Sequence, residues 1–110
     1  MKYEMKTDKF YEAYSVFCHT VTNPIRLKII DIINKDKLNV SEIQQKADIS
    51  MSNLSNHLSA LYKLGILGRE KKGNFNYYFL VEKDILKVMS AAGKLMEKIF
   101  KSKHVEIIKK

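Results

Sequence analysis

Residues 50–67 read SMSNLSNHLSALYKLGIL, and this stretch decides the fold. Leu54, Leu58 and Leu61 follow one another at steps of four and three residues, the spacing that places side chains on one face of an α-helix. A serine at the start is a good N-cap, and a glycine follows the last apolar turn, where helices commonly end. The pattern predicts a helix over 50–64 that turns its leucines towards a core.

The opposite face of this helix is small, polar and uncharged until Lys63, although 29% of the chain is charged. Short hydroxyl and amide groups let a helix lie deep in the major groove of DNA, where they hydrogen-bond to base edges and phosphates. A surface that packs against another protein is the alternative. The face consists of Ser52, Asn56, Ser59 and Lys63, with Ser55 on its flank.

The segments on either side complete a known motif. Ser41 and Gln44 have the spacing of a capping box, which predicts a short helix to about Lys46. Residues 66–71 and 75–80 favour two strands around a Lys-Gly-Asn turn. Two short helices joined by a tight turn form a helix-turn-helix, and a hairpin directly after it makes a winged helix. We therefore expect a helix-turn-helix over 41–64 and a wing over 66–80.

Helical patterns also cover the two ends of the chain, over residues 8–21 and 82–103, and a further helix follows Asn23-Pro24 to about Asn34. The terminal stripes are more apolar than one helix-turn-helix core requires, and monomers rarely expose such patches. We expect a mainly α fold with a small β-hairpin, whose terminal helices form a dimer interface. The stripes contain Phe10, Tyr14, Phe17, Leu95, Met96 and Ile99.

The composition indicates one soluble cytoplasmic domain over residues 1–110. The sequence has no secretory signal and no apolar run of the roughly 20 residues that span a membrane, and its single cysteine suits a reducing compartment. The formal charge of +8 favours an anionic partner, nucleic acid first. Residues 1–36 are close to neutral, so the excess lies in the middle and the C-terminal end. We expect Lys63, Arg69, Lys71 and Lys72 to neutralise phosphates.

The motifs NPIRLKIIDII, NVSEI, SMSNLSNHLSALYKLGIL and GNFNYYFL lie in order from Asn23 to Leu80 and resemble the arsenic-repressor (ArsR) family of bacterial and archaeal transcriptional regulators. The resemblance implies a homodimeric winged helix that binds a palindromic operator on double-stranded DNA and usually represses. By position, Met51, Ser52, Ser55 and Asn56 fall where family members touch DNA. Glutamine is common in the family at the place of Met51.

We expect this chain to be a sequence-specific DNA-binding regulator. A winged-helix module that uses the same surface for a protein partner is the alternative from another class. Base readout is assigned to Ser52, Ser55 and Asn56, with Met51 and Asn53 close by. Phosphate contacts are assigned to Ser59, Lys63, Arg69, Lys71 and Lys72.

The family's usual metal sites lack their ligands here. One site uses Cys-x-Cys in the helix before the recognition helix, where this chain has Glu42-Ile43-Gln44-Gln45. The other uses Asp-x-His and His-x-x-His on the last helix, where the closest match is Asp84-Ile85-Leu86 followed by Glu97 and Phe100. Two carboxylates are a poor transition-metal site without imidazole or thiolate ligands. We expect no metal at these sites and no cofactor.

Two single residues have a further interpretation. His57 lies about 60° from Leu54 on a helical wheel, which favours an internal hydrogen bond over base reading. Cys18, beside His19, Phe17 and Val21, has three open interpretations. It is an inert core cysteine, a redox-sensing thiol, or part of a zinc site completed by His104 of a partner subunit.

Catalysis has no support in the sequence. No Gly-rich phosphate loop, paired carboxylates or nucleophile set is present, and the histidines at 19, 57 and 104 are scattered. We expect that the protein is not an enzyme.

Overall fold

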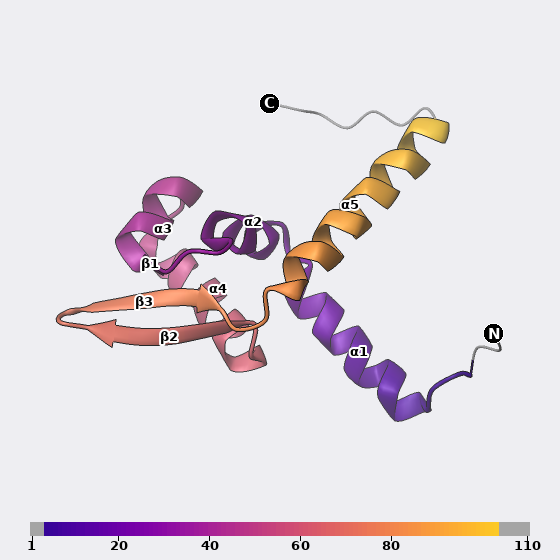
Figure 1. The fold of residues 1–110 in the computed structure, drawn as a ribbon, viewed down its shortest axis with the longest axis horizontal. Helices are drawn as coiled ribbons and strands as arrows, with labels where there is room; N and C mark the ends of the chain where they lie inside the picture. Colours follow the sequence, from indigo (N-terminus) through magenta and orange to yellow (C-terminus); the bar gives the residue numbers. More distant parts are fainter. Residues whose placement is uncertain (1–3, 104–110) are drawn as a thin grey trace.

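The computed structural model describes residues 4–103, which form helices around a small antiparallel sheet (Figure 1). The winged helix expected from the sequence is confirmed, with the body in the middle of the view and the hairpin projecting from it. The elements are α1 (Asp8–Val21), α2 (Pro24–Ile33), β1 (Leu38–Asn39), α3 (Val40–Ala47), α4 (Met51–Leu64), β2 (Leu67–Lys72), β3 (Phe75–Leu80) and α5 (Asp84–Ser102).

Local signals set the starts of α2 and α4, as predicted. The Asn23 side chain accepts hydrogen bonds from the backbone N–H groups of Ile25 and Arg26, and a proline at the first helical position loses no needed donor. Ser50 Oγ accepts from the N–H of Asn53 at 3.2 Å. These caps satisfy backbone donors that no residue inside the helix can reach.

The predicted capping box of α3 is wrong by two residues. Asn39, not Ser41, caps the helix: its side chain accepts from the N–H of Glu42, whose carboxylate accepts from the N–H of Asn39, both at 2.9 Å. Asn39 has this role because it also belongs to the short strand β1, where its backbone is extended as an N-cap requires. The helix therefore begins at Val40, before the predicted start.

The sheet has the order β1-β3-β2, and all pairs are antiparallel. The long hairpin pairs Leu67 with Leu80 at its base and Lys72 with Phe75 at its tip, where Gly73 has φ +60°. A positive φ at the first residue of a two-residue turn suits glycine. β1 extends the sheet through the pairing of Leu38 with Tyr78 and was not predicted, because two residues carry no readable alternation.

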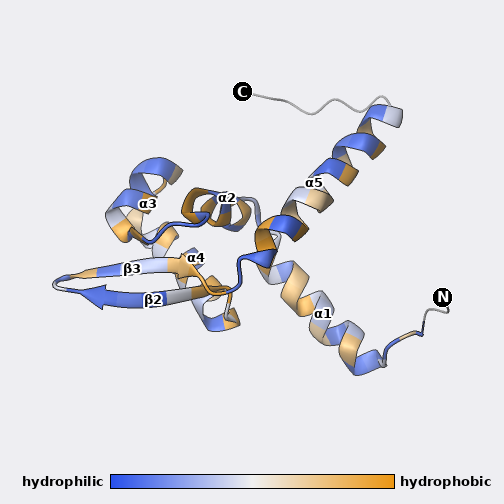
Figure 2. Ribbon diagram, in the orientation of Figure 1, coloured by the Kyte–Doolittle hydropathy of each residue, from blue (hydrophilic) through white to orange (hydrophobic). Residues whose placement is uncertain are grey.

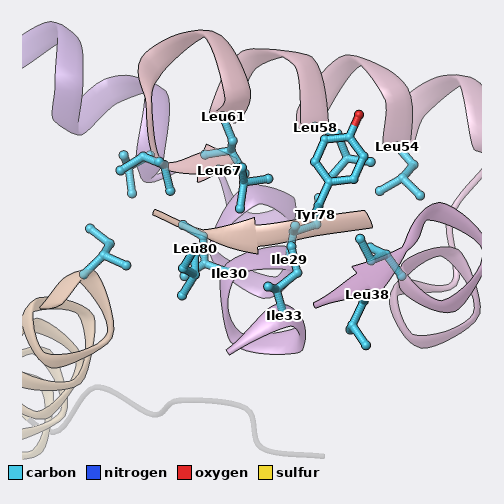
Figure 3. Close-up of a cluster of buried hydrophobic side chains, with 14 residues drawn as sticks. Ile29, Ile30, Ile33, Leu38, Leu54, Leu58, Leu61, Leu67, Tyr78 and Leu80 are labelled. Carbon is cyan, nitrogen blue, oxygen red and sulfur yellow. The ribbon is translucent and has the colours of Figure 1, made fainter. Parts of the chain in front are cut away.

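The core lies between α4, α2 and the base of the sheet (Figure 3). Leu54, Leu58 and Leu61 are at most 2% exposed, which confirms the predicted inner face of α4. Tyr78 and Leu80 of β3 pack against the same cluster, so the hairpin is fixed to the helix at its base. The other fully buried side chains include Ile29, Ile30, Ile33, Ile43 and Leu67.

Helices α1 and α5 extend away from the body, on the side opposite the hairpin tip (Figure 1). The radius of gyration is 16.3 Å, against about 13 Å for a compact domain of this length. Figure 2 shows apolar residues along both helices. Phe10, Tyr14, Leu95, Met96 and Ile99 are each at least 42% exposed. Both helices thus leave apolar stripes open to solvent.

Lysines recur along the sequence of α5. Within residues 4–103, no helix is both long enough and apolar enough to cross a membrane.

Candidate DNA-binding surface

The first turns of α4 present a continuous polar surface. Ser52, Asn53, Ser55 and Asn56 are all exposed, and Met51 beside them is 41% exposed. None of these side chains carries a charge, and within residues 4–103 only that of Ser52 makes a hydrogen-bond contact, a 3.5 Å approach to Ser50 Oγ. The surface therefore offers hydroxyl and amide groups whose donors and acceptors are open to a partner.

The rest of this face of α4 differs from residue to residue. Ser59 is half-buried, whereas Lys63 in the last turn is exposed. The helix ends at Gly65, with φ +95°, as the sequence predicted. Of the predicted contacts on α4, only Ser59 is therefore partly covered, and the others are open.

Three cations lie along β2, in different surroundings. The Arg69 guanidinium lies 4.3 Å from the centre of the Tyr62 ring of α4, an arrangement that holds it against the recognition helix. Lys72 Nζ is 4.0 Å from the Glu70 carboxylate. Lys71, on the opposite face of the strand, has no ion pair within residues 4–103. Lys71 is thus the wing cation with the least internal compensation.

Glu70 reduces the positive charge on the outer face of the wing. Its carboxylate accepts a 2.7 Å hydrogen bond from Lys37 Nζ, and this contact lowers the pKa of the Glu70 carboxyl, so it stays ionised at neutral pH. Lys37 also lies 5.0 Å from the centre of the Phe79 ring. Neither Lys37 nor Tyr62 was predicted from the sequence. Lys37 meets a strand residue 33 positions later, and Tyr62 meets Arg69 only when β2 folds back after the end of α4.

His57 is an internal hydrogen-bonding residue, as predicted. It is 9% exposed, and its Nδ1 accepts a 3.1 Å hydrogen bond from Nε of Arg26 on α2. An Nδ1 that accepts carries no proton, so the imidazole is neutral. Burial, with a smaller contribution from the Arg26 charge, lowers the pKa of His57. The histidine side chain points into the protein, away from the open residues of α4.

Because the folded state lowers the pKa of His57, acidification should destabilise the protein through this residue. Below a pH of about 6.5, the unfolded chain takes up a proton that the folded chain resists, so the free energy of unfolding falls with pH. Asparagine at position 57 keeps an acceptor and cannot titrate. Urea unfolding between about pH 7.5 and 5.5 should show a smaller loss for His57→Asn than for the wild type. Equal losses would contradict this assignment.

Cys18 lines an apolar groove of about 490 Å³ between α1, α2 and α5. It is half-buried, with Phe17, Met89 and Met96 among its neighbours in the groove. No group of three or more His, Cys, Asp or Glu side chains gathers anywhere within residues 4–103. His104, the expected partner of a zinc site at Cys18, lies outside the described residues.

Comparison with known proteins supports the same interpretation. Residues 23–68 match the model of the bacterial regulatory protein, arsR family. The cadmium resistance transcriptional regulatory protein CadC of Listeria innocua is 33% identical over 88 residues, which cover 79% of this chain and 74% of that protein. An identity of this level over most of both chains shows a common family.

Two solved structures share the fold. The crystal structure of Rv0081 from Mycobacterium tuberculosis has a TM-score of 0.81 at 22% identity, covering 90% of this chain and 100% of that one. A homodimeric winged helix-turn-helix DNA-binding domain from Mycobacterium bovis has a TM-score of 0.72 at 17% identity, covering 87% of this chain and 92% of that one. These structures show the winged-helix fold, and the matched family model with the 33% identity to CadC shows that the chain belongs to the arsR family of DNA-binding transcriptional regulators.

Proposed function

We propose that this protein is a cytoplasmic homodimeric repressor that binds a palindromic operator through α4 and the wing. The observation that carries the proposal is the open, uncharged polar surface on the first turns of α4, a helix against whose last turn Arg69 of the basic strand β2 packs. A helix with such a surface fits the major groove, and neighbouring cations supply the sequence-independent part of the affinity. Regulators of this family bind DNA, which makes duplex DNA the partner that this surface serves.

The open residues are assigned to base readout because they reach a base edge with little bulk. Asn56 offers a donor and an acceptor that match the adenine edge, and Ser52 and Ser55 let the helix approach closely. Met51 adds an apolar contact, and Asn53 lies next to it on the same turn. Phosphate contacts are assigned to Ser59, Lys63, Arg69, Lys71 and Lys72.

The whole chain is proposed to act as one domain with three parts. The helix-turn-helix and the wing read DNA, while α1 and α5 hold two copies together. Winged-helix dimers bind half-sites about one helical turn apart, roughly 34 Å, so the dimer contacts set the spacing of the operator. A winged-helix domain of the same fold from Mycobacterium bovis is homodimeric, which is consistent with a dimer here.

Alanine at Asn56 should cost about 1–3 kcal/mol on the preferred operator and should reduce discrimination between operator and scrambled duplex. The salt dependence of binding should hardly change, because no charge is removed. The measurement is equilibrium binding to an operator recovered by selection from a random DNA pool. Gln45→Ala, which removes an exposed amide from α3, is the matched control.

Equal weakening of both duplexes by Asn56→Ala would contradict its assigned role. If the wild-type chain bound no duplex at any salt concentration, the surface would belong to a protein-interaction module instead. A DNA regulator should bind even random duplex weakly and with strong salt dependence.

Regulation by the family's usual metal sites does not fit this chain. Where the family has the Cys-x-Cys thiolates, α3 has Glu42-Ile43-Gln44-Gln45, and where it has histidines, α5 has Leu86, Glu97 and Phe100. The relative CadC is a cadmium resistance regulator by description, but these positions supply neither soft nor imidazole ligands here. We propose that DNA release in this protein does not use those sites.

Zinc, cadmium, copper or arsenite at low micromolar concentration should therefore leave operator binding unchanged. The test is a DNA-binding titration with each metal, alongside a metal-sensing relative as positive control. Stoichiometric binding that displaces DNA would refute the prediction and would direct attention to Cys18 and His19.

A further inference from the structure

Arg26 connects three helices through one side chain. From the first turn of α2, its Nε donates to Nδ1 of His57 on α4 at 3.1 Å, and its Nη1 donates to the backbone carbonyl of Thr20 on α1 at 3.0 Å. Its own backbone N–H is held by the Asn23 cap. The guanidinium is planar, so the two bonds fix the direction of α4 and of the end of α1 together.

The bond to Thr20 meets a need that the local sequence creates. Inside a helix, the carbonyl of Thr20 would accept from the residue four positions later, but that residue is Pro24, which has no N–H. α1 ends at Val21, so this carbonyl is also at the negative end of the helix dipole. Arg26 supplies both the missing donor and a favourable positive charge.

The bond from Arg26 to His57 fixes the orientation of α4, which the packing of the leucines leaves partly free. Leu54, Leu58 and Leu61 press α4 against the core, but apolar contacts are not directional and allow small rotations or shifts of a helix. A hydrogen bond weakens steeply when its geometry changes. His57 also directly follows Asn56. A shift of the contact between Arg26 and His57, here called the joint, therefore moves the residue assigned to base readout.

We propose that Arg26 is a positioning residue for DNA reading, which sets the recognition helix relative to α1 by holding Thr20 and His57 at once. This inference rests on the proposed function, in which α1 contributes to the dimer and α4 reads bases. In a dimer, the joint also sets where each recognition helix stands relative to that of the other copy. A misplaced helix loses base contacts while the wing cations still meet phosphates, so operator binding should suffer more than binding to random duplex.

Lys28 provides a matched control on the same helix. Its Nζ donates to the carbonyl of Ala47 at the end of α3, at 3.1 Å, so it also joins a cation of α2 to a helix C-terminus. It does not reach α4. Arg26→Gln and Lys28→Gln each remove one positive charge and one bond to a helix C-terminus, but only Arg26→Gln also removes the bond to His57.

The experiment measures binding of the full chain to operator and to scrambled duplex at one salt concentration. Arg26→Gln should weaken operator binding about tenfold, with a much smaller effect on scrambled duplex, while Lys28→Gln should change operator binding less than about twofold. Equal losses for the two variants, or an equal loss on both duplexes, would overturn the proposal.

Variants of His57 test the same joint without changing the charge of Arg26. His57→Asn keeps an oxygen acceptor near the place of Nδ1 and should retain most of the operator preference, whereas His57→Leu should lose it as Arg26→Gln does. In the Arg26→Gln background, His57→Leu should cost little more. Additive losses, or equal behaviour of Asn and Leu, would overturn the proposal, and this pair decides the matter if Arg26→Gln fails to fold by circular dichroism.

The wild type separates this inference from the proposed function. If the wild type prefers the operator and Arg26→Gln prefers it equally, the positioning role is wrong and the proposed function stands. If the wild type shows no preference between duplexes, the proposed function is wrong.

Discussion

The double substitution Lys71→Ala and Lys72→Ala is expected to weaken binding to every duplex. In a symmetric dimer it should lower the magnitude of the slope of log affinity against log salt concentration by about four. Each lysine that meets a phosphate releases a counterion, and the dimer carries two copies of each. Between about 50 and 200 mM salt, the wild type should therefore lose roughly a hundredfold more affinity than the variant. Discrimination between operator and scrambled duplex should stay nearly constant, because phosphates carry no sequence information.

The two lysines should not contribute equally. Lys72 lies 4.0 Å from Glu70, whereas Lys71 has no ion pair within residues 4–103. Lys71→Ala should therefore reduce the salt slope at least as much as Lys72→Ala.

The measurement is binding to operator and scrambled duplex over that salt range. Lys35→Ala with Lys83→Ala is the matched control, because both lysines border the groove between α2 and α5 rather than the wing. If the wing variant changed specificity and left the salt slope intact, the roles of wing and helix would be reversed.

The double substitution Leu95→Lys and Ile99→Lys is expected to convert the dimer into monomers and to lower the affinity for the operator by a factor of about 10²–10⁴. These side chains are 57% and 47% exposed in the single chain, within the apolar stripe of α5. Buried against a second copy, two ammonium groups would be desolvated without partners. The monomer would engage one half-site at a time and lose the advantage of a linked second contact.

Sedimentation and operator binding measure the two effects together. Val81→Lys, which places one such charge at a 60% exposed position between β3 and α5, should leave both unchanged. A fragment of residues 22–81, without the terminal helices, should be monomeric or insoluble. If that fragment dimerised like the full chain, the interface would lie elsewhere.

The sequence by itself determined the elements whose signals are local. The leucine spacing of α4, its serine cap and the glycine after it are all read within about four turns of helix, and the structure has this helix over Met51–Leu64. The bounds of α1 agree with the predicted 8–21 for the same reason. Periodicity and caps depend on neighbours in the chain, so they are visible before folding. The open polar face of α4 also follows from them.

Only the tertiary structure decided the contacts between distant residues. Leu38 pairs with Tyr78 and so adds β1 to the sheet, and Lys37 reduces the charge of the wing because folding brings it to Glu70, 33 positions later. Arg26 meets His57 across 31 positions. No periodicity in the sequence predicts such pairs, because the number of residues between the two partners follows no repeating pattern. They form where the core places the helices, which is why the sequence named His57 as internal but could not name its donor.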